Sequence, residues 1–241
     1  MAHSRTASLS IRLGVIGIVA FVVGPALAQL GWASPFVSFR IFGLSLLLGL
    51  LALVVGSVGL WRTRATSGRE GRQSALAGAS VGLLLVVIAV APTLASGPGP
   101  VINDITTDVD DPPVFSAAQT DDANTGRDLA YPGEEFASRQ REGYPDLEPI
   151  RVKASPVEAY AQCLAAAKAL GWKITMQDAA TGRFEAIDVT SIFRFIDDIA
   201  VRVRPGAGGA VVDVRSKSRD GKGDMGANTA RIRAFRSELS G

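Results

Sequence analysis

Residues 197–235 read DDIAVRVRPGAGGAVVDVRSKSRDGKGDMGANTARIRAF, and the rest of the chain is organised around this stretch. Two runs in which apolar and polar residues alternate flank a turn rich in proline and glycine. This pattern is typical of two antiparallel strands joined by a hairpin. In the first run the alternation directs Ile199, Val201 and Val203 to the core, and Arg202 and Arg204 outward. A polar loop and an amphipathic helical pattern follow the second run.

The second run predicts a strand of the same kind. It is expected to bury Val212 and Val214 and to expose Asp213, Arg215 and Lys217. Both strands therefore carry charges on one face of the predicted sheet, opposite a face that is apolar.

Two helical patterns bracket the strands. Ser155 can cap the first helix, with Pro156 at the first helical position and Glu158 in the first turn, and the pattern stops at Gly171. Asp224 can cap the last helix. The apolar side of that helix carries Ala227, Ile232 and Phe235.

Two further strands are predicted at Trp172–Gln177 and Arg183–Val189, joined by a turn at residues 178–182. The order of elements is then helix, four strands, helix. This order predicts the α+β class, with an antiparallel sheet and both helices on one of its faces. We expect residues 151–241 to form this domain.

Three long apolar runs fill the N-terminal part of the chain, at Leu13–Leu30, Phe36–Leu60 and Leu76–Leu94. Each is close to the roughly 20 residues that cross the hydrocarbon core of a bilayer as a helix. Arg40 interrupts the second run near its start, where its long side chain can reach the interface. Residues 1–96 are therefore expected to form a membrane domain of three packed transmembrane helices.

The arginines predict the orientation of these helices. Arg5 and Arg12 precede the first run, and four more arginines lie between the second and third runs, whereas the link between the first two has no charge. The positive-inside rule then places the N-terminus in the cytoplasm and, after three spans, residues 97–241 on the other side. We expect a multi-pass protein of the inner (cytoplasmic) membrane with a periplasmic C-terminal domain. Cleavage of the first run as a signal peptide after Ala28 is an alternative that preserves this sidedness.

Residues 97–150 form an acidic, proline-rich segment with twelve acidic residues against three arginines. Such a composition makes little regular structure, and we expect an extended arm. Its net charge of −9 faces a net charge of +5 in residues 151–241, which favours docking of the arm on the following domain. The acids do not follow the spacing of an EF-hand calcium loop. The aromatic residues spaced as anchors along the arm are Phe115, Tyr131, Phe136 and Tyr144.

Several runs occur in order along the second half of the chain: NDITTDVDDPPVF, YPGEEF, REGYPDLEPI, AAAKALGWKI, GRFEA, FIDDIAVRVRP, VDVRSKSR and NTARIRAF. Together they resemble the bacterial and plastid family known only as domain of unknown function 1499 (DUF1499), over roughly residues 98–239. The membrane-embedded front end is also similar to members of that family. The resemblance implies an architecture and brings no activity to transfer. Asp220 stands where the family more often has an apolar residue, which weakens a strictly cationic interpretation of its loop.

The candidate binding feature is the loop Ser216–Asp224, which leads into the last helix. Backbone N–H groups at a helix N-terminus, with Lys217, Arg219 and Lys222 nearby, can hold an anion such as a phosphate or a lipid headgroup. The acid inside the loop opposes this, and Asp224 as a cap would occupy the same N–H groups. The spacing of a P-loop is missing. The alternative is a solvated, capped connection.

A basic stripe on adjacent strands comprises Arg202, Arg204, Arg215 and Lys217. Pairing with Glu185 and Asp213 across strands would make this stripe a stabilised, solvated face. The functional alternatives are docking of the acidic arm, of a partner protein or of an acidic lipid surface, and the predicted topology argues against nucleic acid.

Asp197 and Asp198 are neighbours on one strand, so their side chains point to opposite faces and cannot serve one catalytic site. We expect one carboxylate to be buried in an ion pair with an arginine and the other to be exposed. A hydrolytic pairing of Asp198 with Arg219 is the alternative.

Cys163 is the only cysteine and His3 the only histidine. An intramolecular disulfide, a cysteine-based zinc site and a histidine-dependent triad are therefore excluded. Cys163 lies in an apolar helical pattern and is expected to be a buried hydrophobic residue. We expect no metal and no cofactor, and no catalytic residue can be named.

These patterns lead us to expect an integral membrane protein without enzymatic activity. It would present an extracytoplasmic α+β domain for binding or assembly in the cell envelope, with the lipid bilayer and an envelope protein or an anionic lipid headgroup as partners. The alternative is an enzyme or ligand-binding domain that acts on an anionic envelope component through the loop Ser216–Asp224. A transporter subunit would need polar residues inside the spans, and these are nearly absent.

Overall fold

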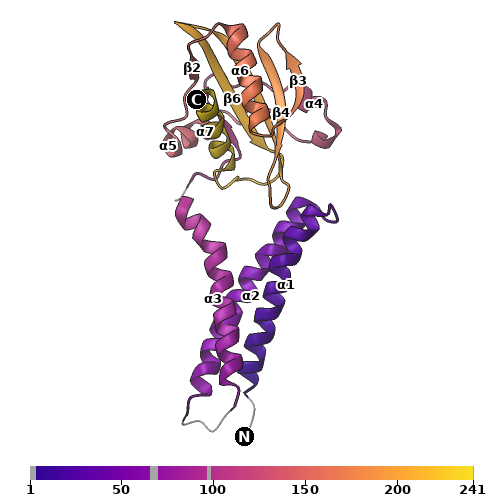
Figure 1. The fold of residues 1–241 in the computed structure, drawn as a ribbon, viewed down its shortest axis with the longest axis vertical. Helices are drawn as coiled ribbons and strands as arrows, with labels where there is room; N and C mark the ends of the chain where they lie inside the picture. Colours follow the sequence, from indigo (N-terminus) through magenta and orange to yellow (C-terminus); the bar gives the residue numbers. More distant parts are fainter. Residues whose placement is uncertain (1–3, 66–69, 97–98, 241) are drawn as a thin grey trace. The chain divides into compact units, whose positions relative to one another are not determined.

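The computed structural model of the protein describes residues 4–65, 70–96 and 99–240 (Figure 1). The chain divides into two compact units. One contains Met1–Pro98 together with Ser191–Arg194, and the other contains Gly99–Thr190 and Phe195–Gly241. The first unit is helical, and the second combines a β-sheet with helices.

The helices of the first unit are α1 (Arg5–Gln29), α2 (Pro35–Arg62) and α3 (Arg72–Ser96). Each contains a segment that is long and apolar enough to cross a membrane, which confirms the three helices expected from the apolar runs. Ser34 caps α2, because its hydroxyl accepts a hydrogen bond from the backbone N–H of Val37 at 3.4 Å. Helices α1 and α3 begin well before their apolar runs do, since polar residues and arginines continue them outward.

Small residues line the contacts between these helices. The buried positions of α1 recur every three or four residues, at Ala7, Ser10, Gly14, Gly17, Ala20, Gly24 and Ala28. A Cβ on Gly24 would lie 2.8 Å from the backbone nitrogen of Phe42 in α2. A Cβ on Gly56 would lie 2.8 Å from that of Ala79 in α3. The helices therefore meet backbone to backbone, which is how membrane helices gain packing contacts in the absence of a hydrophobic driving force.

The second unit is an α+β domain, as the sequence predicted. Its strands are β1 (Asp104–Thr106), β2 (Ile150–Val152), β3 (Lys173–Asp178), β4 (Arg183–Val189), β5 (Ile196–Gly206) and β6 (Gly209–Ser218). Its helices are α4 (Ala117–Thr120), the 3₁₀ turn η2 (Asp122–Asn124), α5 (Glu134–Gly143), α6 (Pro156–Ala169) and α7 (Ala227–Ser240). The antiparallel sheet has the order β1-β6-β5-β4-β3, and β2 also pairs with β6.

The sheet has six strands where the sequence predicted four. The two additional strands, β1 and β2, are three residues long and come from the acidic segment and its end. They pair with different parts of β6, Thr106 opposite Arg215 and Ile150 opposite Val212. Strands this short lack a readable alternation, so the sequence pattern could not identify them.

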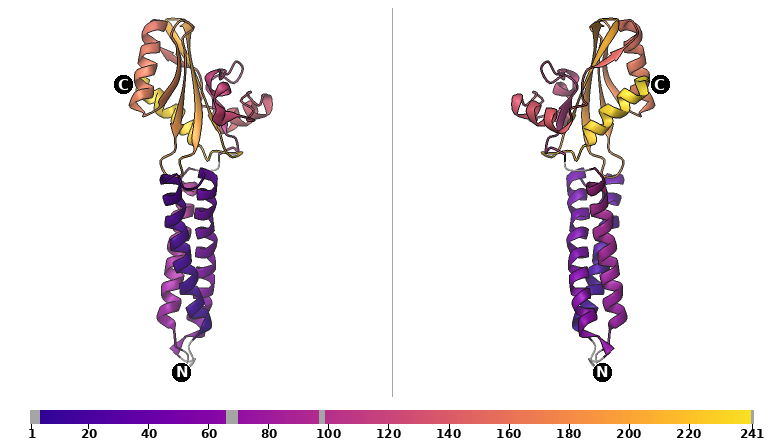
Figure 2. Two further views of the ribbon diagram at one scale, coloured as in Figure 1. Left: turned by 90° about the vertical axis from the view of Figure 1, so that its right-hand side faces the viewer. Right: turned by 90° about the vertical axis from the view of Figure 1, so that its left-hand side faces the viewer.

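Helices α6 and α7 cover one face of the sheet (Figure 2). A capping box starts α6, where the N–H of Ser155 donates to the carboxylate of Glu158 at 3.0 Å and the N–H of Glu158 donates to Ser155 Oγ at 3.3 Å. Trp172 stacks on Phe235 of α7 with 5.0 Å between ring centroids. The residues predicted to face inward are buried in this core: Ile199, Val201, Val203, Val212, Val214 and Ile232.

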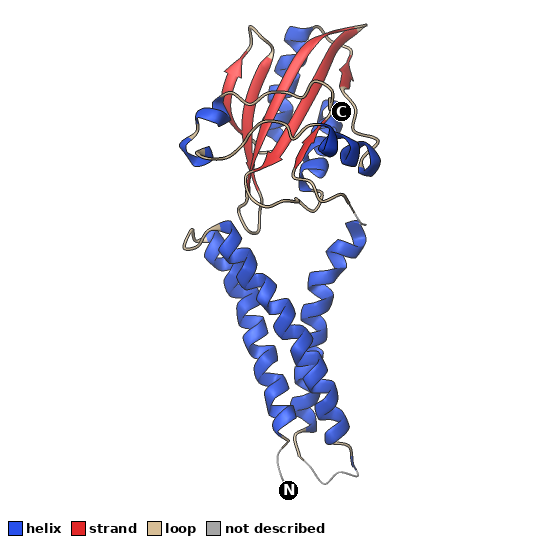
Figure 3. Cartoon of the chain, turned by 180° about the vertical axis from the view of Figure 1, so that it is seen from behind, coloured by secondary structure: helices blue, strands red, loops and turns tan. Residues whose placement is uncertain are grey.

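The acidic segment crosses the opposite face of the sheet (Figures 2 and 3). We call residues 104–149 the arm. Asp213 and Arg215, which the sequence predicted to be exposed, are 0% and 2% exposed beneath it. That prediction was wrong because alternation identifies two faces of a strand but does not reveal that a distant segment covers the charged one.

The arm also closes the edge of the sheet. Gln140 of α5 donates its amide N–H to the carbonyl oxygen of Thr106 at 2.6 Å and accepts the Thr106 backbone N–H at 3.0 Å. The side chain of Gln140 thus satisfies the N–H and the C=O of Thr106, the two backbone groups with which an additional strand would form hydrogen bonds. In the gap between β1 and β2, Thr107 exchanges hydrogen bonds with the backbone of Val214.

Candidate functional site

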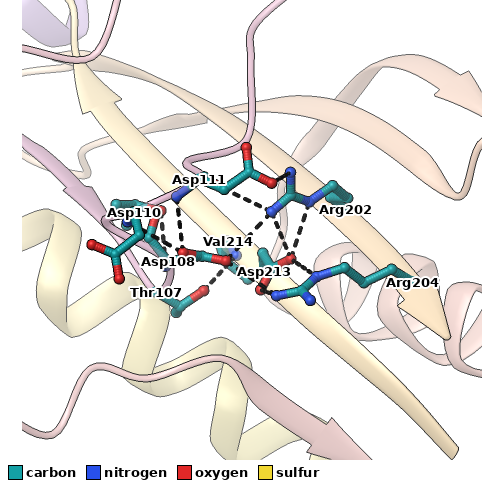
Figure 4. Close-up of polar contacts among 9 residues, drawn as sticks. Thr107, Asp108, Asp110, Asp111, Arg202, Arg204, Asp213 and Val214 are labelled. Carbon is teal, nitrogen blue, oxygen red and sulfur yellow. Dashed lines mark hydrogen bonds and ion pairs between the residues drawn. The ribbon is translucent and has the colours of Figure 1, made fainter. Parts of the chain in front are cut away.

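A network of carboxylates and guanidinium groups lies between the arm and the sheet. The basic residues predicted as a stripe all belong to it. Figure 4 shows one part, where Asp108 and Asp111 from the arm and Asp213 from β6 surround Arg202 and Arg204.

Asp213 holds the two arginines of β5 together. Its carboxylate accepts hydrogen bonds from Nε of Arg202 at 3.0 Å and from Nε of Arg204 at 2.8 Å. Arg202 also pairs with Asp111 at 2.8 Å, and Arg204 with Asp108 at 3.1 Å. The hydrogen bond to Asp213 and the nearby acids raise the pKa of Arg204 above its ordinary value. The two arginines and the three carboxylates thereby form ion pairs with one another inside the domain.

Arg215 is the most enclosed member of the network. Its guanidinium donates to both oxygens of Asp104, at 2.9 and 2.7 Å, and both side chains are almost fully buried. The carbonyl oxygens of Pro113 and Leu129 accept its remaining hydrogen bonds at 3.1 and 2.9 Å. Asp104 also forms an ion pair with Lys217 at 2.9 Å. Such a group is paired on every side, as a buried charge has to be.

Two aromatic anchors predicted on the arm lie against the same guanidinium. The carbon at its centre is 4.6 Å from the ring centroid of Phe115 and 5.5 Å from that of Tyr131. This distance permits a cation–π interaction in a desolvated setting. Burial raises the pKa of Tyr131 to about 12, so the ring stays neutral at physiological pH.

Arg219 forms the third part of the network. It donates to the two oxygens of Asp198 at 2.9 and 2.7 Å and to Asp121 of the arm at 2.8 Å. The amide of Asn124 donates to the same Asp198 carboxylate at 3.1 Å. The pairing of Asp198 with Arg219 is therefore present in the fold, as an enclosed ion pair held by the arm.

The loop Ser216–Asp224 is divided between strand and connection. Residues 216–218 belong to β6, and the helix α7 starts only at Ala227. Asp220 pairs with Arg127 at 3.1 Å, while Asp224 accepts the backbone N–H groups of Gly226 and Asn228 at 2.9 and 2.8 Å. The predicted cap at Asp224 is confirmed.

The three residues of that loop that were predicted to bind an anion have different surroundings. Lys217 is paired with Asp104, and Arg219 with Asp198 and Asp121. Lys222 is exposed and has no ion pair among the residues that the structure describes. The structure therefore does not bring the three cations to one open pocket.

Sequence reasoning missed the partners of two buried polar groups. Glu185 was expected to pair with the basic stripe, but it accepts four hydrogen bonds from the start of α4: two from Ser116 and one each from Ala117 and Ala118, at 2.5–3.0 Å. Its position on a strand carried no signal of a partner nearly 70 residues away.

The second missed group is Arg231 of α7. On the core side of the sheet it binds Asp197 at 2.6 Å and Asp188 at 2.8 Å, and it donates to Asn228 at 2.7 Å. Burial raises the pKa of Asp197, although Arg231 acts in the opposite direction. Both Asp197 and Asp198 are thus buried, which corrects the expectation that one would be exposed. The arm covers the face where Asp198 would otherwise meet solvent.

An open cavity of ≈ 420 Å³ lies between the turn after β1 and the chain that follows α5. Asp110 and Arg141 are among its lining residues. Arg141 forms ion pairs with Asp110 at 2.8 Å and with Glu134 at 2.7 Å. The basic group that could bind an anion there is already paired.

Neither a metal centre nor a reactive thiol is evident in the part of the chain that the structure describes. Among those residues, no three histidine, cysteine or acidic side chains are arranged to hold a metal ion. Cys163 is fully buried in the core, and burial raises the pKa of its thiol to about 12. The prediction of a buried hydrophobic residue is confirmed.

Comparison with protein families supplies the classification. The family model described as "Protein of unknown function (DUF1499)" matches residues 104–239, more than half of the chain. The chain belongs to the DUF1499 family. No curated protein matches the chain. The DUF1499 match begins at Asp104 and extends past Arg231, so the arm and its whole ion-pair network lie inside the family domain.

Proposed function

We propose that this protein is a multi-pass protein of the inner membrane that holds its DUF1499 domain close to the periplasmic surface, as a non-enzymatic module for binding or assembly in the envelope. One observation carries the proposal. The arm is built into the sheet from Asp104 onward, so it does not act as a long tether.

Chain length sets the reach of the domain. Seven residues separate Ser96, the end of α3, from Asp104, the start of β1. Such a connection extends at most about 28 Å, whereas a free chain through residue 149 could extend to about 190 Å. The start of the sheet is therefore confined to the neighbourhood of the last span.

Sidedness rests on the arginine distribution. Arg5 and Arg12 lie at the start of α1, and four arginines surround the link between α2 and α3. The positive-inside rule assigns these ends to the cytoplasm and the end of α3 to the periplasm.

The paired state of the basic residues argues against a catalytic or anion-binding role for them. Arg202, Arg204, Arg215, Lys217 and Arg219 each have a carboxylate partner within the domain. A catalytic or anion-binding role for them would require removal of the arm. The alternative of an anionic ligand at the loop Ser216–Asp224 would have to rest on Lys222.

Two measurements on the full-length protein test the proposal. A reporter fused after Gly241 is expected to be active only when exported, and cross-linking in the native membrane is expected to yield a discrete protein adduct. Activity of the reporter only in the cytosol would contradict the sidedness.

Cross-links to lipid alone would contradict the assembly role. A rise in the melting temperature with phosphate compounds, lost in Lys222→Ala and retained in Lys168→Ala, would favour the ligand-binding alternative.

A further inference from the structure

One end of the helical unit is rich in arginine. Helices α1 and α3 begin there, and α2 ends there (Figure 1). The backbone N–H of Ser4 donates to the carbonyl oxygen of Glu70 at 3.0 Å, and a Cβ on Gly59 would lie 3.0 Å from Cβ of Ala75. The start of α1, the end of α2 and the start of α3 are therefore neighbours. We call this the arginine end. Its arginines are Arg5, Arg12, Arg62, Arg64 and Arg72.

The arginine end carries a positive charge that the chain does not neutralise. All five arginines are exposed, and Glu70 is the only acidic residue of the sequence before residue 97. Four of the five form no ion pair with any residue that the structure describes: Arg5, Arg12, Arg62 and Arg72. The arginines of β5 and β6, by contrast, are paired with carboxylates of their own domain. Counter-charges for the arginine end therefore have to come from outside the chain.

The arginines lie where apolar segments end. Arg12 directly precedes the first apolar run, and Arg62 follows the second run by two positions. Trp61 stands between that run and Arg62 and is 65% exposed, and the guanidinium carbon of Arg64 is 5.2 Å from its ring centroid. Basic residues and tryptophan at the end of an apolar span are typical of the membrane–water interface. These side chains are therefore at the level of lipid headgroups if the helices cross a bilayer.

Two of the arginines share one side of α1. Arg5 and Arg12 are seven residues apart, close to two helical turns, so their side chains project in nearly the same direction about 10 Å apart along the axis. The Cα–Cβ bond of a helical residue tilts toward the helix N-terminus, which directs Arg12 back toward the level of Arg5. Both guanidinium groups can thus approach phosphates at the headgroup level.

We infer that the arginine end binds the phosphate groups of anionic phospholipids, so that a lipid such as phosphatidylglycerol is enriched around it. A guanidinium group donates two parallel hydrogen bonds to a phosphate, and each basic side chain near a bilayer surface strengthens the attraction of anionic lipid about fivefold. Lipid is favoured over an acidic protein because the arginines adjoin the exposed apolar surface of the helices. The inference rests on the part of the proposed function that places α1–α3 in a bilayer, and it depends neither on the sidedness nor on the assembly role.

Quenching of tryptophan fluorescence by brominated lipid tests the inference, because the chain has a probe at each end of the helical unit. Trp61 lies at the arginine end, and Trp32, 75% exposed in the link between α1 and α2, lies at the other end. The third tryptophan, Trp172, is buried in the sheet domain and is common to both samples. The full-length variants Trp32→Phe and Trp61→Phe are placed in phosphatidylcholine vesicles that contain chain-brominated phosphatidylglycerol or chain-brominated phosphatidylcholine.

The measured quantity is the ratio of the apparent association constants of the two brominated lipids at each tryptophan. We expect a ratio of at least about fivefold in favour of phosphatidylglycerol at Trp61, and a ratio near one at Trp32. Rising salt should lower the ratio at Trp61.

Arginine variants in the Trp32→Phe background identify the groups that bind the lipid. Changing Arg5, Arg12 and Arg62 together to glutamine should bring the ratio at Trp61 close to one, whereas changing the same three to lysine should retain most of it. Arg40→Gln is the matched control, since Arg40 lies near the start of α2, at the other end of the helical unit, and it should leave the ratio unchanged.

A ratio near one at Trp61 would overturn the inference, as would a preference that the triple glutamine variant keeps. Shielding of Trp61 from both brominated lipids and from aqueous acrylamide would also overturn it, because a protein such as a second copy would then cover this end. Failure of the proposed function looks different: neither tryptophan would be quenched by brominated phosphatidylcholine. Quenching of both tryptophans without a preference would contradict the lipid site alone.

Discussion

Asp104 and Arg215 form a two-point ion pair, at 2.9 and 2.7 Å, in which the side chains are 0% and 2% exposed. The pair joins β1, the first strand of the arm, to β6. The first prediction addresses how much this pair contributes to holding the arm in the domain.

Asp104→Asn is expected to destabilise the domain by about 3–5 kcal/mol, because it leaves Arg215 and part of Lys217 buried without a counter-charge. Chemical denaturation of the full-length protein in detergent measures the change. Asp110→Asn is the control: its side chain is 85% exposed and its pair with Arg141 should contribute less than about 1 kcal/mol. Similar losses of stability in the two variants would show that the burial of Asp104 does not increase the contribution of its ion pair.

Gln140→Ala is expected to cost about 2–4 kcal/mol, since it leaves the N–H and the carbonyl of Thr106 buried without partners. It should also increase self-association, because the edge of the sheet becomes available for pairing. Thermal melting and light scattering measure the two effects. Gln177→Ala, at an exposed position of β3, should change neither. A stable, monodisperse Gln140→Ala variant would refute the role assigned to the amide.

Asp146→Asn is expected to alter how stability depends on pH. Hydrogen bonds from Arg233 lower the pKa of Asp146 below its ordinary 3.8, so the charged carboxylate stabilises the folded state above that pH. This stabilisation is lost as the pH falls through the lowered pKa. Because both side chains are about half exposed, the difference between wild type and variant should stay below about 1 kcal/mol at pH 7. Melting curves from pH 2 to 7 should converge in acid, and a constant offset would contradict the pairing.

Cys163 is expected to resist thiol reagents at pH 8 until the domain unfolds. Its burial and its thiol pKa of about 12 leave almost no accessible thiolate. The rate of labelling should therefore follow the unfolded fraction across a denaturant series. Rapid labelling of the native protein would mean that α6 opens locally from the sheet.

The elements with a strong period were predictable from the sequence. The strand Arg183–Val189 has the predicted bounds, and the capping residues Ser155 and Asp224 do what their positions indicated. In each case the signal is local, because alternation and caps involve residues a few positions apart.

The arrangement of the charges was not predictable in the same way. Composition favoured docking of the arm, but it could not assign Asp104 to Arg215 or Asp121 to Arg219, pairs that lie 111 and 98 residues apart. The strands β1 and β2 were missed for a related reason, since three residues contain too little pattern and gain their structure from β6. The burial of Asp198 depends on this long-range docking.

The amide of Gln140 has a consequence where copies of the protein share a bilayer, as the proposed function requires. Copies that diffuse in two dimensions collide often and in similar orientations, so an open strand edge would let one sheet continue into the next. At one margin Gln140 takes the place of the missing neighbour, and at the other the register of β3 is interrupted between Ile174 and Met176. A high local concentration of this domain is therefore expected to leave its copies unpaired at these two sheet edges.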